Sequence, residues 1–149
     1  YEKSGISEKP DIWVLSGAMN ITTKILELVE NCKNEVMITL PEVGIDLVKQ
    51  ALPKLRALHD KGVKITILTS DKIDKESITS IKRVAEIKIK KGLFGGGIIS
   101  DKRYVVILLG PEVAGENSSE VIAIWADHIG LAGFARQYFE YLLKDSKKT

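Results

Sequence analysis

Apolar and polar positions follow one another along the chain in a repeated order of strand and then helix. Short β-branched runs at residues 12–16, 35–40 and 63–69 have the length of strands. Between them, apolar residues recur at helical spacing: Ile21, Ile25, Leu28, Val29 and Cys32 first, then Ile45, Val48, Leu52, Leu55 and Leu58. We expect Asn20 to cap the first helix and Pro53 to bend the second. Helices that join successive strands predict an α/β fold with parallel strands.

The second half of the chain predicts further elements of the same domain. They are a short helix within 70–80, an edge strand at 85–90, a hairpin of 95–101 and 104–110 that turns at 101–103, a loop at 111–119, a strand at 120–125 and a closing helix at 131–142. We therefore expect a three-layer α/β domain with a mixed, mostly parallel sheet and helices on both faces. Its interior includes Trp13.

The length of 149 residues suits one domain, flanked by short polar ends. Residues 1–10 are polar with Gly5 and Pro10 and predict a linker, and residues 144–149 predict a solvated tail. The domain itself is expected to span residues 11–143.

Charge and composition exclude several classes of function. Twenty-two basic and twenty acidic residues leave a net charge of +2, too small for this chain to bind DNA phosphates by itself. No apolar run approaches the roughly 20 residues of a membrane-spanning helix, and a single cysteine, Cys32, forms no internal disulfide. The two histidines, His59 and His128, have no metal-ligand spacing. We expect a cytoplasmic protein without a metal or other cofactor.

Residues 62–68 (GVKITIL), a later two-strand segment with a central Asp101 and a final amphipathic helix together resemble the phospholipase D-like fold. Catalytic members carry His-x-Lys-x4-Asp, in which the His is the nucleophile, the Lys grips phosphate and the Asp orients the His. With Asp101 in the Asp position, the His and Lys positions hold Phe94 and Gly96, and shifting the register by one residue does not restore the motif. The resemblance thus implies a fold whose catalytic motif is lost, and we expect no enzymatic activity.

Three segments, 12–33, 92–110 and 121–142, together resemble the effector-binding domain of the TrmB family of archaeal transcription regulators. The resemblance implies a homodimeric regulator in which this domain senses a small polar effector such as a sugar. It also implies that DNA is bound only through an N-terminal winged-helix domain, which is missing from this chain. Two alternatives stay open: a divergent phosphodiesterase or nuclease of phospholipase D type, and a dimerisation module without a small ligand.

A candidate effector site combines a glycine run with two strand ends. Consecutive glycines let backbone N–H groups approach a ligand closely, and an indole beside a carboxylate suits a sugar. We expect these groups to meet at the C-terminal edge of the sheet, where α/β domains gather ligands. The candidate ligand-binding residues are Phe94, Gly95, Gly96, Gly97, Ser100, Asp101, Trp125 and Asp127. The competing interpretation is structural: a strand bulge at the glycines, and a core Trp125 followed by an Asp or His cap of the last helix.

Overall fold

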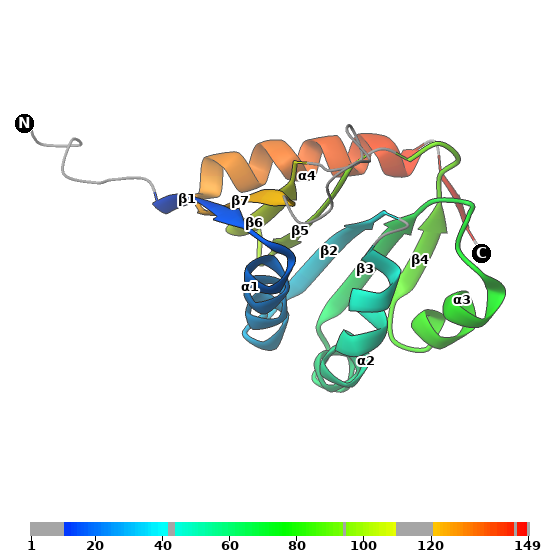
Figure 1. Cartoon of the computed structure of the whole chain (residues 1–149). Coiled ribbons are helices and arrows are strands. Elements are labelled where there is room, and N and C mark those ends of the chain that lie inside the picture. The colour runs from blue at the N-terminus through cyan, green and yellow to red at the C-terminus, as the bar shows by residue number, and fades with distance from the viewer. Residues whose placement is uncertain (1–10, 42–43, 94, 110–120, 145, 149) are drawn as a thin grey trace, which may run out of the picture.

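A computed structural model describes residues 11–41, 44–93, 95–109, 121–144 and 146–148 of the chain. Helices cover both faces of a single sheet, with α1, α2 and α3 on one face and the long last helix, α4, on the other (Figure 1). The elements are β1 (Asp11–Ser16), α1 (Ala18–Glu30), β2 (Glu35–Leu40), α2 (Ile45–Asp60), β3 (Lys64–Thr69), α3 (Lys75–Lys82), β4 (Glu86–Ile89), β5 (Gly96–Ser100), β6 (Tyr104–Leu108), β7 (Ile122–Asp127), α4 (Ile129–Lys144) and β8 (Lys147–Lys148). The predicted three-layer α/β class is therefore confirmed.

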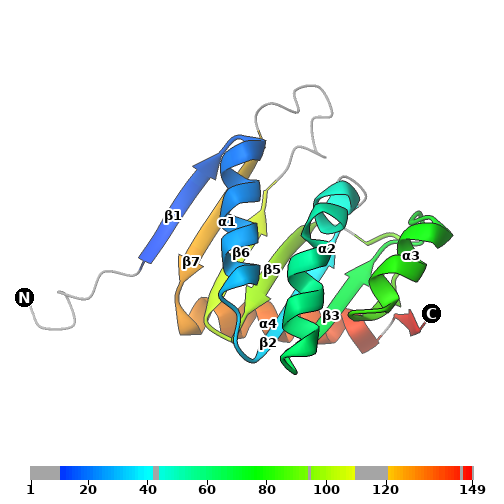
Figure 2. The same cartoon turned by 90° about the horizontal axis from the view of Figure 1, so that it is seen from below.

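The eight strands of the described residues lie in the order β1-β7-β6-β5-β2-β3-β4-β8. Only the neighbours β2–β3 and β3–β4 are parallel, whereas β1–β7, β7–β6, β6–β5, β5–β2 and β4–β8 are antiparallel. The prediction of a mostly parallel sheet was wrong. Helical crossovers join neighbouring strands only from β2 to β3 and from β3 to β4, because α1 leads from β1, which pairs at the far edge with β7, to β2 (Figure 2).

Most local predictions are confirmed, but the strand expected at the edge, β4, pairs with both β3 and β8 and is therefore not an edge strand. The hairpin turns at 101–103 as expected. The second helix contains Pro53, and the bend expected there stays a prediction. Asn20 does not cap α1, because Gly17, with a φ of 90°, stands at that position. The expected solvated tail is also wrong in part, since α4 runs to Lys144 and Lys147–Lys148 pairs with β4. The predicted linker at 1–10 and the loop at 111–119 lie outside the described residues.

Side chains alternate between two apolar layers, as the period of a strand requires. In β3, Ile67 packs in the layer under α1, α2 and α3, while its neighbour Leu68 packs in the layer under α4, and both are fully buried. Trp13 departs from the prediction of a core position, because 48% of it is exposed. Within the described residues, no helix combines the length and apolar character needed to cross a membrane.

Candidate functional site

A cavity of about 320 Å³ lies between α4 and the edge of the sheet where β2 ends. Its walls come from β2, from β5 up to Ile99, from β6 and from α4. The lining residues are Met37, Thr39, Gly95, Gly96, Gly97, Ile98, Ile99, Val105, Val106, Ile107, Leu108, Leu109, Phe134, Ala135, Tyr138 and Phe139. None of these side chains is a carboxylate, an imidazole or an amine, and the single titratable group is the phenol of Tyr138, so the lining is better suited to binding than to acid–base chemistry.

The predicted glycine run forms part of the cavity wall, but packing also demands these glycines. A Cβ at Gly96 would lie 2.7 Å from Cδ of Pro41, and a Cβ at Gly97 would lie 2.5 Å from the carbonyl oxygen of Val106. Gly95 has open space around it but a φ of 85°, which glycine adopts without strain. The glycines therefore let strands approach closely as well as exposing backbone to the cavity. Phe94 lies outside the described residues.

Ser100 and Asp101 lie at the other end of β5, away from the cavity. The carboxylate of Asp101 accepts hydrogen bonds from the backbone N–H groups of Lys33 (2.9 Å), Asn34 (2.7 Å) and Glu35 (3.1 Å). These donors form the connection between α1 and β2, and Ser100 is buried beside them. Asp101 thus ties the hairpin turn to the α1–β2 connection.

Hydrogen bonding and burial shift the pKa values of two neighbouring groups, the Asp101 carboxyl and the Cys32 thiol. Burial by itself would raise the pKa of the Asp101 carboxyl, but the three backbone N–H groups and the Cys32 thiol together lower the pKa below its ordinary value. Burial is also the main reason that the pKa of the Cys32 thiol is raised, and the Asp101 charge adds to it. Because a raised pKa reduces the thiolate fraction, Cys32 is a poor nucleophile, as its position on the apolar stripe of the first helix predicts.

Trp125 and Asp127 lie apart from the cavity too. Trp125 packs against the α1 layer, stacked on Trp13 with ring centroids 5.5 Å apart and with Nζ of Lys24 4.4 Å above its ring. Asp127 accepts a hydrogen bond of 2.6 Å from Nε of Arg103. The expected convergence with the glycine run is therefore not found: Trp125 belongs to the opposite face and Asp127 to the opposite edge.

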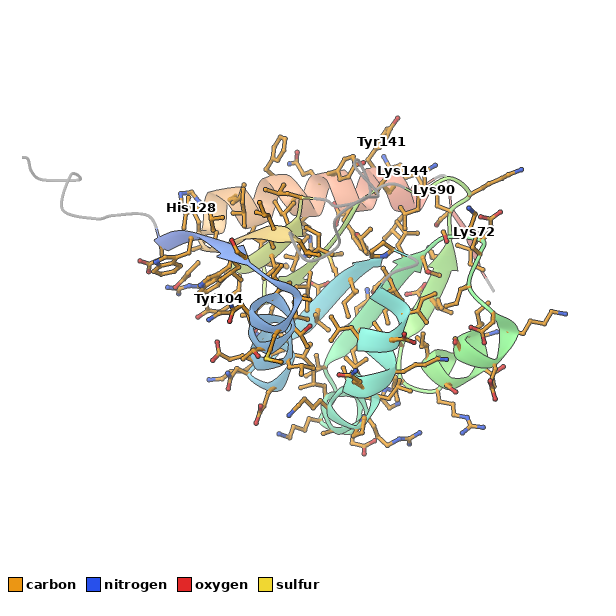
Figure 3. All side chains as sticks on the ribbon, viewed as in Figure 1. Lys72, Lys90, Tyr104, His128, Tyr141 and Lys144 are labelled. Atoms are coloured by element: carbon orange, nitrogen blue, oxygen red, sulfur yellow. The ribbon has the colours of Figure 1, made fainter. Side chains whose placement is uncertain are left out.

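Figure 3 makes the separation visible, since Tyr104, which contacts Trp125, points to the α1 side while Tyr141 lies on α4. His128, which follows Asp127, caps α4 by accepting a hydrogen bond of 2.9 Å at Nδ1 from the N–H of Leu131. The competing structural interpretation is thus confirmed for the histidine cap.

The cavity residues on α4 were not predicted as site residues. Phe134 and Tyr138 belong to the apolar stripe of the closing helix, which predicts a core role, yet 74% of Phe134 and 53% of Tyr138 are exposed. Exposed aromatics one helical turn apart at the mouth of a cavity are a sign of a binding surface. The apolar stripe of the closing helix therefore contained these residues in the sequence. Whether they are buried or exposed depends on where α4 crosses the sheet, which the sequence does not give.

Arg136 holds α4 against the sheet. Its Nη1 lies 2.6 Å from a carboxylate oxygen of Glu35, at the start of β2, and its Nε lies 3.2 Å from Glu140. The hydrogen bond to Glu35 is the main reason that the pKa of Arg136 is raised. This ion pair fixes the helix that forms the outer wall of the cavity.

Comparison with known proteins identifies one matching family. Residues 11–147 match the family model described as transcriptional regulator TrmB, EBD N-terminal subdomain. Comparison with curated proteins gives no match. Among solved structures, TrmBL2, described as an archaeal chromatin protein with a novel mode of DNA binding, is similar with a TM-score of 0.70 and 20% identity. The alignment covers 96% of this chain but 56% of the TrmBL2 chain, so this chain spans little more than half of that relative.

Two further proteins of known structure share the fold. NucT from Helicobacter pylori has a TM-score of 0.77 at 13% identity, over 95% of this chain and all of its own. Nuc from Salmonella typhimurium, a phospholipase D family member, has a TM-score of 0.73 at 13% identity, over 95% of this chain and 99% of its own. The predicted phospholipase D-like fold is thereby confirmed.

Proposed function

Because this chain belongs to the TrmB family of transcriptional regulators, we propose that it is a ligand-sensing and dimerising domain and that it catalyses no reaction. DNA contact is assigned to a separate domain of the complete regulator. The even charge balance of this chain, +2 overall, supports that division.

The cavity beside the glycine run is the observation that carries the sensing role. Gly95, Gly96 and Gly97 line it, and its volume of about 320 Å³ falls within the range of small-molecule sites. It lies at the edge where β2 and β3 end, the edge at which α/β sheets gather ligands. We assign the effector to this cavity, so Ser100, Asp101, Trp125 and Asp127 take structural roles.

The geometry around Asp101 supports the absence of catalysis. A phospholipase D-type mechanism needs a carboxylate that orients a histidine, beside a lysine that grips phosphate. Here Gly96 stands at the lysine position, and the carboxylate of Asp101 accepts backbone hydrogen bonds at the far end of β5. Purified protein should therefore not hydrolyse bis-nitrophenyl phosphate or single-stranded DNA. Turnover that survives purification and disappears in Asp101→Asn would favour the nuclease alternative.

The outer edge of the sheet supports the dimerising role. Among the described residues β1 pairs with β7 alone, and it exposes Ile12, Trp13 and Val14. An exposed apolar edge strand is a template for strand pairing with another chain, and two antiparallel copies of β1 would form a symmetric contact. We therefore place the dimer contact at this edge.

A ligand screen tests the sensing role directly. Thermal shifts of the chain are measured with sugars, nucleotides, amino acids and small aromatic compounds, and each hit is repeated with Ala135→Leu, which places a larger side chain in the cavity wall. Ala57→Leu, at an exposed position on α2, is the matched control. A hit that persists in the control and is lost in Ala135→Leu supports the proposal. If no compound binds, the dimerisation module without a ligand becomes the better account.

A further inference from the structure

Building on the proposed sensing role, we infer that the cavity takes an uncharged and mostly apolar ligand, an aromatic or branched aliphatic molecule, and not a sugar or nucleotide. The inference rests on the composition of the walls, on the exposed aromatics at the mouth, and on the position of α4. It replaces the small polar effector that the sequence predicts.

The walls offer almost nothing to a polar ligand. Two lining side chains, Thr39 and Tyr138, carry a hydroxyl group, and the others are aliphatic, aromatic or glycine. Most backbone groups of β5 and β6 are already engaged in the antiparallel ladder that joins these strands. Hydrogen-bonding capacity is thus confined to these two hydroxyl groups and to the backbone groups that the ladder leaves unpaired.

This composition discriminates strongly between ligand classes. A sugar carries hydroxyl groups around its whole ring, and each one that enters the cavity gives up hydrogen bonds to water without a replacement. A nucleotide would also bury phosphate charge, for which the walls hold no cation. An apolar molecule gains from the removal of its own surface and of the cavity surface from water. The lining therefore selects against sugars and nucleotides.

The mouth of the cavity points to the same class. Phe134 and Tyr138 on α4 and Leu109 after β6 all line the cavity, and more than half of each is exposed. Large apolar side chains that gather at an opening are typical of ligand sites and are unfavourable when left in water. A bound ring would cover them and would restore contacts that the empty volume lacks.

The position of α4 gives the ligand a means of acting on the rest of the protein. One wall of the cavity is α4 itself, which the ion pair between Arg136 and Glu35 fixes to β2. A molecule between α4 and the sheet contacts both of them. Its affinity therefore differs between conformations in which the distance from α4 to the sheet differs. Differential affinity is the requirement for a ligand-driven switch.

Binding is tested on the whole chain with indole and naphthol as apolar probes and with maltose and AMP as polar ones. Indole and naphthol should raise Tm by about 2 °C or more at millimolar concentration, and maltose and AMP should leave it unchanged. NMR spectra of labelled methyl groups should show shifts at Ile99, Val105 and Ala135 and none at Ile81, which is buried on the other face.

Variants that fill the cavity test its role. Ala135→Leu acts from the helix and Ile107→Phe from the sheet, and either one should weaken indole binding by about tenfold or more. Ala57→Leu should bind like the native chain. The two variants change opposite walls of the cavity. If one of them unfolds the protein, the other still tests whether indole binds there.

Three results would overturn the inference. Equal binding of indole by the native chain and both filled variants would place the site elsewhere. A shift with maltose or AMP that Ala135→Leu abolishes would leave the sensing role intact but refute the apolar class. If no probe binds the native chain and Ala135→Leu loses the dimer, the cavity would instead hold a side chain of a second copy of the chain. Conversely, indole that binds in the cavity but does not alter DNA affinity of the complete regulator would refute sensing and keep the apolar site.

Discussion

Replacing Asp101 distinguishes a structural carboxylate from a ligand-binding one. In Asp101→Ala, three backbone N–H donors of the α1–β2 connection lose their acceptor. Water can replace it at Lys33 and Asn34, whose hydrogen bonds are exposed, but less readily at Glu35, whose bond is partly buried. A hydrogen bond to a charged group contributes about 1.5–3 kcal/mol. We assign this full value to the bond from Glu35 and about 0.3 kcal/mol each to the bonds from Lys33 and Asn34.

The backbone adds to the cost of alanine. Asp101 has a φ of 56°, a left-handed conformation that costs most residues about 1–2 kcal/mol, whereas Asp and Asn adopt it more easily. We therefore expect Asp101→Ala to lower the free energy of unfolding by about 3 kcal/mol and Asp101→Asn, which keeps one acceptor oxygen, by about half as much. Denaturant unfolding followed by tryptophan fluorescence measures both, and the exposed Asp71→Asn is the control.

The pH dependence provides a second measurement on the same residue. The folded protein holds the pKa of Asp101 below its ordinary value, so the folded state favours the charged carboxylate. Its stabilising contribution is therefore present above the unfolded pKa of about 3.9 and is lost as pH falls through the folded value. Asp101→Asn should lose this component of the acid sensitivity. An Asp101→Ala protein as stable as the native chain that fails to bind an effector would refute the structural assignment.

Further substitutions test the turn, the α4 anchor and the edge strand. Lys102→Gly should stabilise the protein by about 0.5 kcal/mol in denaturant unfolding, because Lys102 has a φ of 59° and Asp-Gly suits this type of turn. Arg136→Ala should cost about 1–2 kcal/mol, since it leaves the partly buried Glu35 without its partner, and Glu35→Gln should cost less. Val14→Lys should convert a dimer to a monomer in light scattering, whereas Gln50→Lys, on α2, should not; an unchanged dimer in Val14→Lys would exclude the β1 edge.

The positions of helices and strands could be predicted because each element has its own spacing of apolar residues along the sequence. The apolar period places α2 at the bounds that the structure gives, and alternation places β2 there as well. The order of strands depends on pairing between distant segments, such as β1 with β7, which no local pattern records. The mostly parallel sheet was predicted because the first half of the chain alone has helical crossovers.

The site could be predicted only in part, because closeness in sequence was taken as closeness in space. Gly96 and Ser100 are the two ends of β5, and four strand steps of roughly 3.3 Å separate them by about 13 Å. Trp125 was assigned to the same cleft, but its face depends on register: it pairs with Val106 and Trp13 and packs under α1. Since a shift of one residue would turn Trp125 to the α4 face, alternation alone could not place it. The glycine run was placed at the correct edge of the sheet because β5 begins where β2 ends. The wall formed by α4 could not be predicted, because it depends on where α4 crosses that edge.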